Sequence, residues 1–248
     1  MDAPLLSVVM PTHGHAQFIE TAIKGILSQT YPRVKLLVVS VKGDEQTRKV
    51  LDRLGVKYLE SDRADHIHQI NIGVNETKGE WVSAGASDDS FLPSKLWSEL
   101  ALATQRDALV VYSDFFYGDD QLRVDGVCRA ADFSYERLIG RCMVNDCSLV
   151  SRGLYEEFGP LNEALGSIAF FDRWLHIAEK YPDKIVHNPY PAFIYRRHSG
   201  QKSGVEKLQD PKRLGLMLQV ARASLKRKGL DAEQFKGYRV VRLDYARP

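Results

Sequence analysis

Short apolar runs alternate with helical patterns through the first half of the chain. Residues 5–10 form an apolar run that stops at Pro11, which is typical of a strand buried on both faces. Apolar residues then recur at the spacing of one helix face, at Ile19, Ala22, Ile23, Ile26 and Leu27. Further strands are predicted at residues 35–39, 56–59, 81–86 and 109–112, and further helices from Asp44 and over 66–77. This alternation predicts an α/β chain with a mostly parallel, doubly wound sheet.

The pattern loosens after about residue 115. Here the sequence predicts a hairpin turn at residues 117–120, helices over 132–158 and 171–180, and a short strand over 192–195. Near the C-terminus, an apolar stripe predicts an amphipathic helix, with Leu214, Met217, Leu218, Ala221 and Leu225 on one face. Residues 238–245 are predicted to form a last strand. The chain is therefore expected to divide into residues 1–115, residues 116–204 and a helical C-terminal appendage at residues 205–248.

Composition narrows the class of protein. The chain has 248 residues, of which 44% are hydrophobic and 27% are charged, and this composition excludes a disordered protein. No apolar run approaches the roughly 18 residues of a membrane-spanning helix, and no signal peptide is recognisable, so we expect a cytoplasmic protein. The three cysteines include no close metal-ligand pair, and we expect free thiols.

The net charge of +2 conceals an asymmetry along the chain. Residues 196–248 carry fourteen Lys and Arg against five Asp and Glu, whereas the preceding residues have a balance of −7. Lys226, Arg227 and Lys228 lie beside the apolar stripe of the C-terminal appendage. This pattern suits docking on a partner domain or on an anionic surface, which would make the protein peripheral at the inner face of the membrane. A solvated helix face that covers the core is the alternative.

Candidate site residues are sought directly after the predicted strands, because open parallel sheets bind ligands at the carboxyl ends of their strands. Asp88 and Asp89 follow the fourth strand. Two adjacent carboxylates repel each other, so this position calls for a cation, and oxygen ligands suit Mg²⁺ or Mn²⁺ bridging to a pyrophosphate. A solvated turn that caps the next helix is the alternative. His13 and His15, after the first strand, are candidates to touch a phosphate, with a plain polar loop as the alternative.

Seven short motifs occur in an order and at spacings that resemble those of one enzyme family. They are SVVMPT at 7–12, ILSQTYP at 26–32, NIGV at 71–74, KGEW at 78–81, SDD at 87–89 with Pro93, DRWLHIAE at 172–179 and YRRHSG at 195–200. Together they resemble the family 2 glycosyltransferases, which are inverting enzymes with the GT-A fold. The resemblance covers residues 5–204.

The resemblance implies an enzyme that moves a sugar from a nucleotide-diphosphate donor to an acceptor hydroxyl with inversion, using Mn²⁺ or Mg²⁺ as cofactor. On this basis Asp88 is expected to contact the nucleotide, and Asp89 is the expected metal ligand. His198 is expected to close over the diphosphate and to help hold the metal, and Thr12 is expected to line the base. Residues 1–115 then form the nucleotide-sugar-binding half, and residues 116–204 the acceptor-side half of the same domain.

Two departures from the family pattern concern the donor site. The family places one or two aspartates after its second strand, where one of them contacts the base, but this chain has Ser40 and Val41 there. Contact with the base is therefore expected from Ser40, Lys42, Asp44 or the backbone, and the pattern does not specify uracil. The first Asp of the family's Asp-x-Asp-Asp segment is Ala86 in this chain.

A third departure concerns catalysis. The family's Glu-Asp pair, whose Asp is the usual general base, corresponds to Ala169 and Phe170, and neither can accept a proton. The nearest carboxylate is Asp172, which is either a replacement base or a residue that is favoured near the positive end of a helix. Loss of a base removes about 10²–10⁴-fold in rate. A catalytically degenerate GT-A-like domain that binds a glycan or a partner is therefore the alternative function.

The expected partners follow from the resemblance. They are a nucleotide-sugar donor and a glycan or lipid-linked glycan acceptor, in surface polysaccharide or lipid-linked glycan assembly, with no nucleic acid. A nucleotidyltransferase is the other enzyme considered. It would carry a Gly-rich phosphate loop with a Lys after the first strand, and the sequence Thr12-His13-Gly14 does not supply one.

Overall fold

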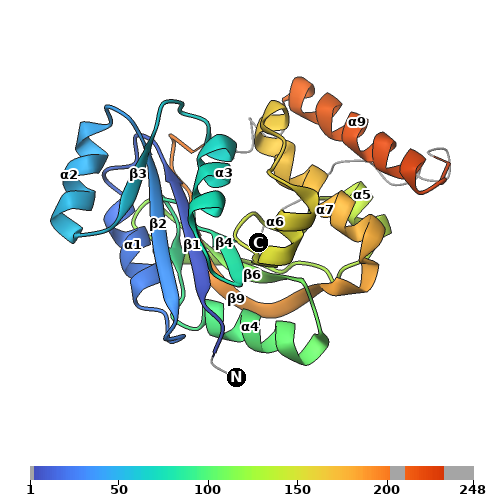
Figure 1. Cartoon of the computed structure of the whole chain (residues 1–248), viewed down its shortest axis with the longest axis horizontal. Helices are drawn as coiled ribbons and strands as arrows, with labels where there is room; N and C mark the ends of the chain where they lie inside the picture. Colours follow the sequence, from blue (N-terminus) through green and yellow to red (C-terminus); the bar gives the residue numbers. More distant parts are fainter. Residues whose placement is uncertain (1–2, 202–209, 232–248) are drawn as a thin grey trace.

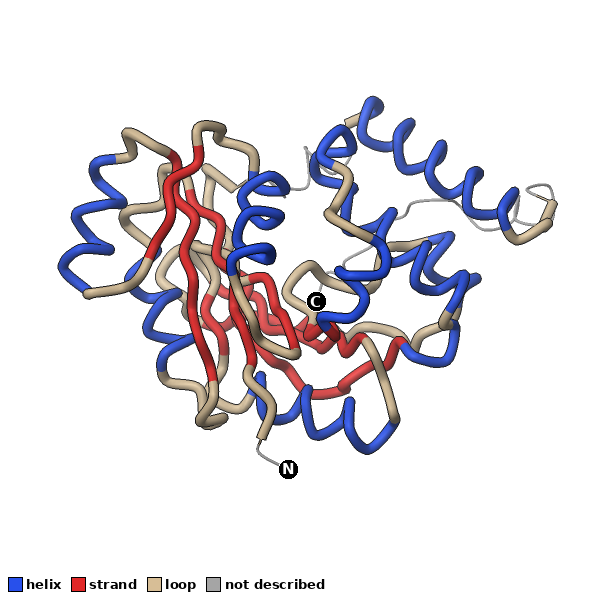
Figure 2. The backbone as a smooth tube through the Cα atoms, viewed as in Figure 1, coloured by secondary structure: helices blue, strands red, loops and turns tan. Residues whose placement is uncertain are grey.

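One sheet of nine strands organises the part of the chain that the structure describes, residues 3–201 and 210–231 (Figure 1). In this computed structural model the strand order is β3-β2-β1-β4-β8-β6-β9-β5, and β7 pairs with β6. Helices lie on both sides of the strands (Figure 2). The predicted α/β class with a doubly wound sheet is confirmed.

Four parallel strands form one half of the sheet. They are β1 (Leu6–Thr12), β2 (Val34–Val41), β3 (Tyr58–Ser61) and β4 (Trp81–Ala84). β1 lies between β2 and β4, and β3 lies on the outer side of β2. Val8 and Val9 of β1 are both fully buried, in different apolar clusters on the two faces of the sheet. Apolar residues in succession therefore mark a strand buried on both faces, as predicted.

The other half of the sheet mixes strand directions. Its strands are β5 (Ser90–Phe91), β6 (Val110–Gly118), β7 (Val124–Cys128), β8 (Leu149–Ser151) and β9 (Ile185–Arg196). β8 runs antiparallel to both β4 and β6 and so joins the two halves. β6 pairs in parallel with β9 and antiparallel with β7. The hairpin turn predicted at residues 117–120 lies slightly later, at residues 119–123, because Tyr117 and Gly118 still belong to β6.

Helices pack on the two faces of the sheet. The α-helices are α1 (Ile19–Leu27), α2 (Glu45–Leu54), α3 (His66–Glu76), α4 (Lys95–Arg106), α5 (Tyr135–Gly140), α6 (Arg152–Phe158), α7 (Ala169–Lys180) and α9 (Pro211–Arg227), with 3₁₀ turns η1 (Glu163–Ile168) and η2 (Pro182–Lys184). The two largest apolar clusters lie on opposite faces. One joins the sheet to α1, α2 and α4, and the other joins it to α3, α5, α6, α7 and α9. α3 lies directly on β1, since an added Cβ at Gly73 would be 2.2 Å from Val9 Cγ1.

The structure corrects one predicted element and extends another. The helix predicted over residues 132–158 is wrong, because this stretch contains α5, an irregular segment, β8 and α6. The predicted strand over 192–195 is the end of the longer β9. The strand predicted over 238–245 lies outside the described residues. The division at residues 115 and 204 stays a prediction, and residue 115 falls inside β6, so that the first two parts share one sheet.

Helix α9 turns its apolar stripe toward the core. Met217, Ala221 and Leu225 are buried, and α9 packs against α7 (Figure 1). Arg227 forms an ion pair with Glu179, with 2.7 Å between Nη2 and Oε1. This placement matches the expected alternative of a helix face that covers the core. No helix within the described ranges is long and apolar enough to cross a lipid bilayer.

A buried ion pair fixes α4 to the middle of the sheet. Lys95 Nζ lies 2.6 Å from Glu99 Oε2, and the two side chains are 0% and 1% exposed. Lys95 also donates to the Cys147 carbonyl, and Glu99 accepts from the Ser113 hydroxyl, both at 2.7 Å. Burial raises the pKa of Glu99, and the charge of Lys95 acts in the opposite direction. The pair therefore holds both β6 and the segment before β8.

We expect Lys95→Met to lower the free energy of unfolding by about 3–5 kcal/mol, because it leaves the Glu99 carboxylate buried without its partner. Urea denaturation at pH 7 measures the loss. Lys24, whose side chain is 68% exposed in its pair with Glu20, gives the control. Lys24→Met should cost at most about 1 kcal/mol. Equal losses in the two variants would contradict the expectation.

Candidate active site

Three side chains from distant parts of the sequence meet at the carboxyl ends of β1 and β4. His15 lies in the loop after β1, Asp88 in the turn after β4, and His198 in the segment after β9. Asp88 Oδ2 is 3.1 Å from His198 Nε2 and 4.0 Å from His15 Nδ1. One ligand atom from each residue lies within 4.8 Å of the other two. We call these three residues the His-Asp cluster.

The loop that carries His15 is held by α2. Gly14 N donates to Asp44 Oδ2 at 2.8 Å, and Asp44 caps α2 by accepting from Thr47 N at 3.2 Å. Burial acts to raise the pKa of Asp44, but the hydrogen bonds from Gly14 and Thr47 outweigh it, so that the pKa is lowered. His15 Nδ1 lies 2.8 Å from Ser87 Oγ. The helix cap predicted at Asp44 therefore also positions His15.

The segment that carries His198 is held by Arg196 at the end of β9. The Arg196 backbone N donates to Asp89 Oδ1 at 2.9 Å, and its Nε donates to the Asp88 carbonyl at 2.6 Å. Arg196 also donates through Nη1 to the Asp120 carbonyl. These bonds tie the end of β9 to the turn after β4, and they bring His198 next to Asp88.

Asp89 is not part of the His-Asp cluster. It is 5% exposed and accepts the backbone hydrogen bond of Arg196. Burial, followed by the charge of Asp88, raises the pKa of Asp89 well above its usual range. The sequence singles out Asp89 as the metal ligand, but the geometry presents Asp88 to both histidines. Among the described residues, the geometry therefore favours Asp88 over Asp89 as the candidate metal ligand.

A cavity with two adjoining halves extends from the His-Asp cluster. The first half, which we call the β1 half, is lined by residues that include Thr12, His13, His66 and Gln69. The second, which we call the β6 half, is lined by residues that include Ser113, Phe115, Asn145, Phe193 and Tyr195. Five residues line both halves, namely Ala86, Asp88, Asp146, Ser167 and Arg213. The two halves therefore meet beside Asp88.

Thr12 and Ser40 lie side by side at the ends of β1 and β2. Each is 2% exposed, and neither hydroxyl oxygen has a hydrogen-bond partner among the described residues. A buried polar atom without a partner costs about 1–3 kcal/mol. Thr12 lines the β1 half of the cavity, whereas Ser40 is not one of the lining residues. Thr12, but not Ser40, is thus a cavity-lining residue, and its hydroxyl oxygen is buried.

Asp172 is not one of the residues that line this cavity. It lies on α7, where its Oδ1 is 3.6 Å from His176 Nε2. Burial raises the pKa of Asp172, and the charges of His176 and Arg227 act against this rise. Ala169 and Phe170 are 1% and 2% exposed and belong to the core. The geometry therefore does not support the sequence-based assignment of Asp172 as the base.

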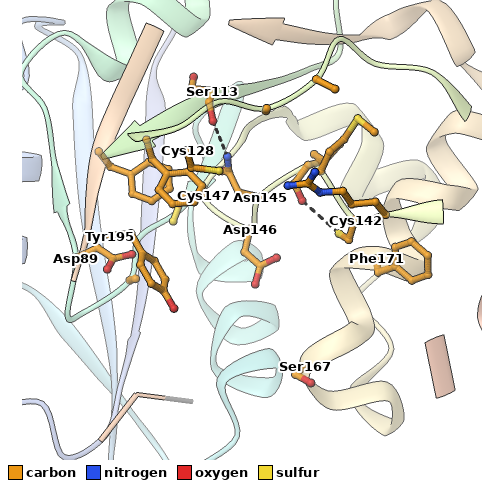
Figure 3. Close-up of a pocket in the computed structure, with 18 of the residues that line it drawn as sticks. Asp89, Ser113, Cys128, Cys142, Asn145, Asp146, Cys147, Ser167, Phe171 and Tyr195 are labelled. Carbon is orange, nitrogen blue, oxygen red and sulfur yellow. Dashed lines mark hydrogen bonds between the residues drawn. The ribbon is translucent and has the colours of Figure 1, made fainter. Parts of the chain in front are cut away.

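Asp146 is a cavity residue that the sequence does not single out. Its side chain projects between Asp89 and Tyr195 on one side and Ser167 and Phe171 on the other (Figure 3). Asp146 lies in the irregular segment before β8, inside the stretch that is predicted as helix, so no local pattern points to it. The sequence identifies His15 as a candidate because it follows the first strand. It does not indicate that His15 lies next to Asp88.

Comparison with known proteins decides the family. Residues 7–158, more than half of the chain, match the sequence profile described as Glycosyl transferase family 2. The chain belongs to glycosyl transferase family 2. The match includes the turn with Asp88 and Asp89, and it ends before the segment that carries His198.

Curated relatives of this family 2 chain are named as glycosyltransferases. An uncharacterized glycosyltransferase of Rickettsia felis is 26% identical over 215 residues, which are 81% of this chain and 35% of the relative. The UDP-Glc:alpha-D-GlcNAc-diphosphoundecaprenol beta-1,3-glucosyltransferase of Escherichia coli is 23% identical over 154 residues, which are 60% of this chain and 61% of the relative. The chain thus spans about a third of the length of the Rickettsia felis protein.

Solved structures share the fold of this family 2 chain. Staphylococcus aureus TarS 1–349 in complex with UDP-GlcNAc has a TM-score of 0.72 at 14% identity, over 93% of this chain and 69% of that chain. The mannosyltransferase PcManGT from Pyrobaculum calidifontis in complex with GDP-Man and Mn²⁺ has a TM-score of 0.63 at 15% identity, over 91% of this chain and 75% of that chain. The predicted GT-A fold with a helical C-terminal part is confirmed.

Two substitutions separate the structural role of Asp89 from its charge. Asp89→Ala should lower the free energy of unfolding by about 1–3 kcal/mol, because it leaves the buried Arg196 N–H without an acceptor. Asp89→Asn retains a carbonyl oxygen for this bond. Folding raises the pKa of Asp89, so the folded state binds the Asp89 proton more tightly than the unfolded state does. The free energy of unfolding therefore falls as the pH rises and Asp89 ionises. Asp89→Asn should therefore be at least as stable as the wild type in urea at pH 8, and a loss equal to that of Asp89→Ala would contradict this.

Proposed function

We propose that this chain is a metal-dependent glycosyltransferase that moves a sugar from a nucleotide-diphosphate donor to an acceptor hydroxyl with inversion at the anomeric carbon. The observation that carries the proposal is the His-Asp cluster at the junction of the two cavity halves. Open α/β sheets bind ligands at this edge. A donor in the β1 half and an acceptor in the β6 half meet beside Asp88.

The His-Asp cluster favours Mn²⁺ over Mg²⁺. Two imidazole nitrogens and one carboxylate oxygen suit a transition metal, whereas Mg²⁺ prefers oxygen ligands and retains its waters. Two ligands that lie about 2.1 Å from one octahedral ion are roughly 3.0–4.2 Å apart. The distances from Asp88 Oδ2 to His198 and His15 are 3.1 and 4.0 Å. A cation held there would neutralise the charge of the departing diphosphate.

The unpartnered hydroxyls support a nucleotide in the β1 half. A ribose or base group that bonds to Thr12 would satisfy a buried oxygen that lacks a partner among the described residues. Ser40, on the next strand, is the second candidate. The solved relatives are complexes with UDP-GlcNAc and with GDP-Man. The fold therefore accepts more than one base, and we leave the base of this donor open.

We place the activity in surface polysaccharide or lipid-linked glycan assembly. The name of the Escherichia coli relative specifies a GlcNAc-diphosphoundecaprenol acceptor. For this chain we propose a glycan or lipid-linked glycan acceptor at the inner face of the membrane. Met217, Ala221 and Leu225 of the α9 stripe are buried, so contact of α9 with a membrane would be mainly electrostatic, through exposed residues such as Arg222 and Lys226.

Manganese binding and donor turnover should both depend on Asp88 and His198. We expect the wild type to release nucleoside diphosphate from UDP-glucose, UDP-GlcNAc or GDP-mannose with Mn²⁺, and EDTA to abolish this release. Asp88→Ala and His198→Ala should each weaken Mn²⁺ binding by at least the roughly 10–100-fold that loss of a supporting group costs. Electron paramagnetic resonance measures free Mn²⁺, and a coupled assay measures the diphosphate.

A surface carboxylate provides the control for these variants. Asp183 lies in η2 and is exposed. Asp183→Ala should leave both Mn²⁺ binding and turnover at the wild-type level. Full metal-dependent turnover in Asp88→Ala would show that the metal assignment is wrong.

A glycan- or partner-binding module is the second candidate, because Ala169 and Phe170 occupy the positions of the usual base pair and are buried. Calorimetry with UDP, UDP-GlcNAc and GDP-mannose in the presence of Mn²⁺ separates the candidates. The enzyme should bind at least one of these nucleotides, whereas a pure glycan binder should give no heat with any of them. Nucleotide binding without any turnover would favour the degenerate domain.

A further inference from the structure

The proposed transfer needs a proton acceptor that the family motif does not supply. As the acceptor oxygen bonds to the anomeric carbon, its hydroxyl proton must leave. Ala169 and Phe170 cannot take this proton, and Asp172 does not line the cavity. The base must therefore be sought among the residues that line the junction of the two halves.

Only two of the five residues that line both halves can act as the general base. Ala86 has no acceptor atom, the Ser167 hydroxyl is a very weak base, and Arg213 stays protonated. Asp88 and Asp146 remain. Asp88 faces His198 and His15, where we place the cation, and this leaves Asp146.

We propose that Asp146 is the general base of this chain, and that it replaces the carboxylate missing at position 170. This inference rests on the proposed glycosyl transfer. Asp146 Oδ takes the proton of the acceptor hydroxyl while the acceptor oxygen bonds to the anomeric carbon. The bond from that carbon to the diphosphate oxygen breaks, and its electron pair leaves with the nucleoside diphosphate.

The sheet topology places Asp146 at the reacting edge. β8 runs antiparallel to β4, with Ser83 opposite Leu149. Residues that precede β8 therefore lie beside residues that follow β4, and this is where Asp88 lies. A parallel strand at this position would carry its preceding residues to the opposite edge of the sheet.

The segment around Asp146 is held in place by its neighbours. Asn145 Nδ2 donates to the Ser113 carbonyl at 3.0 Å, and the Asn145 carbonyl accepts from the Ser148 hydroxyl at 2.6 Å. On the other side, the Cys147 carbonyl accepts from Lys95 Nζ, as described above, and from the Ser83 hydroxyl at 2.8 Å. A base fixed in this way loses little freedom when the acceptor binds.

The Asp146 carboxylate is not engaged by any other described side chain or backbone group. Within residues 3–201 and 210–231 it has no hydrogen bond or ion pair. Two other carboxylates at the cavity are engaged, since Asp89 accepts from Arg196 N and Asp210 accepts from Lys212 N. Although Asp146 is exposed to the solvent of the cavity, enclosure by the cavity walls raises its pKa to about 7, and the charge of Arg213 acts against this rise.

The test compares Asp146→Asn with the wild type and with Asp172→Asn as the matched control. Mn²⁺ and the donor that the wild type consumes among UDP-glucose, UDP-GlcNAc and GDP-mannose are supplied, and water serves as acceptor. Asp146→Asn should lower kcat for diphosphate release by about 10²–10⁴-fold. Its affinity for UDP or GDP in calorimetry should stay at the wild-type value. Asp172→Asn should keep wild-type kcat.

Azide distinguishes loss of a base from a structural defect. Azide is a nucleophile that needs no deprotonation, so it should restore donor consumption in Asp146→Asn with formation of a glycosyl azide. It should not restore Asp88→Ala, which lacks the proposed metal ligand. An active wild type with an equally active Asp146→Asn, or no rescue of an inactive Asp146→Asn by azide, overturns this inference alone. A wild type that consumes none of the donors overturns the proposed function and this inference with it.

The pH dependence gives an independent readout. Asp146 must be ionised to accept a proton, so wild-type kcat/KM should fall as the pH drops below about 7, and Asp146→Asn should lack this fall. The charged and titratable groups that line the cavity around Asp146 are Arg213, Asp88, Asp89, Asp210, Arg141, His13, His15, His66, Tyr195, Cys128, Cys142 and Cys147, and Tyr155 of α6 lies nearby. Because folding raises the pKa of Asp146, Asp146→Asn should melt no earlier than the wild type at pH 8. Earlier melting with loss of nucleotide binding would indicate a structural role and overturn the inference.

Discussion

The hydrogen bond from the Arg196 backbone to the buried Asp89 carboxyl is the contact on which the candidate site depends. It joins the end of β9 to the turn after β4, two segments that are far apart in the sequence. A buried carboxyl without a partner would be costly, so this turn is stable only when the closing segment is in place. With Asp89 committed to Arg196, Asp88 is presented to His198 and His15.

The mixed sheet explains how one edge can carry two kinds of chemistry. The loop after β1 and the turn after β4 that carries Asp88 both lie at the carboxyl ends of these parallel strands, as in any open α/β sheet. β8 is inserted in the opposite direction, so the segment that precedes it arrives at this same edge. The buried Lys95–Glu99 pair fixes this insertion through the Cys147 carbonyl. The proposed cation site and a separate carboxylate thus come from segments next to strands of opposite direction.

The sequence predicts the parts of this arrangement that local patterns encode. The parallel strands are apolar on both faces, and Asp88 and His198 lie in recognisable motifs. β8 has three residues, too few for any periodicity, and it lies between the short helices α5 and α6, so residues 132–158 are mistaken for one helix. The choice between Asp88 and Asp89 depends on which carboxyl the closing segment buries. That choice, like the approach of Asp146, is made by tertiary contacts between distant residues.

Loss of the family's base pair does not by itself imply loss of catalysis. Phe170 stacks on Trp174 with 5.6 Å between ring centroids, so this position has become part of the core. A general base is defined by its place, its ionisation and its rigidity rather than by its motif. Asp146 meets these requirements from another element. A carboxylate that lines the junction of the two cavity halves and pairs with no described residue is available to accept a proton there.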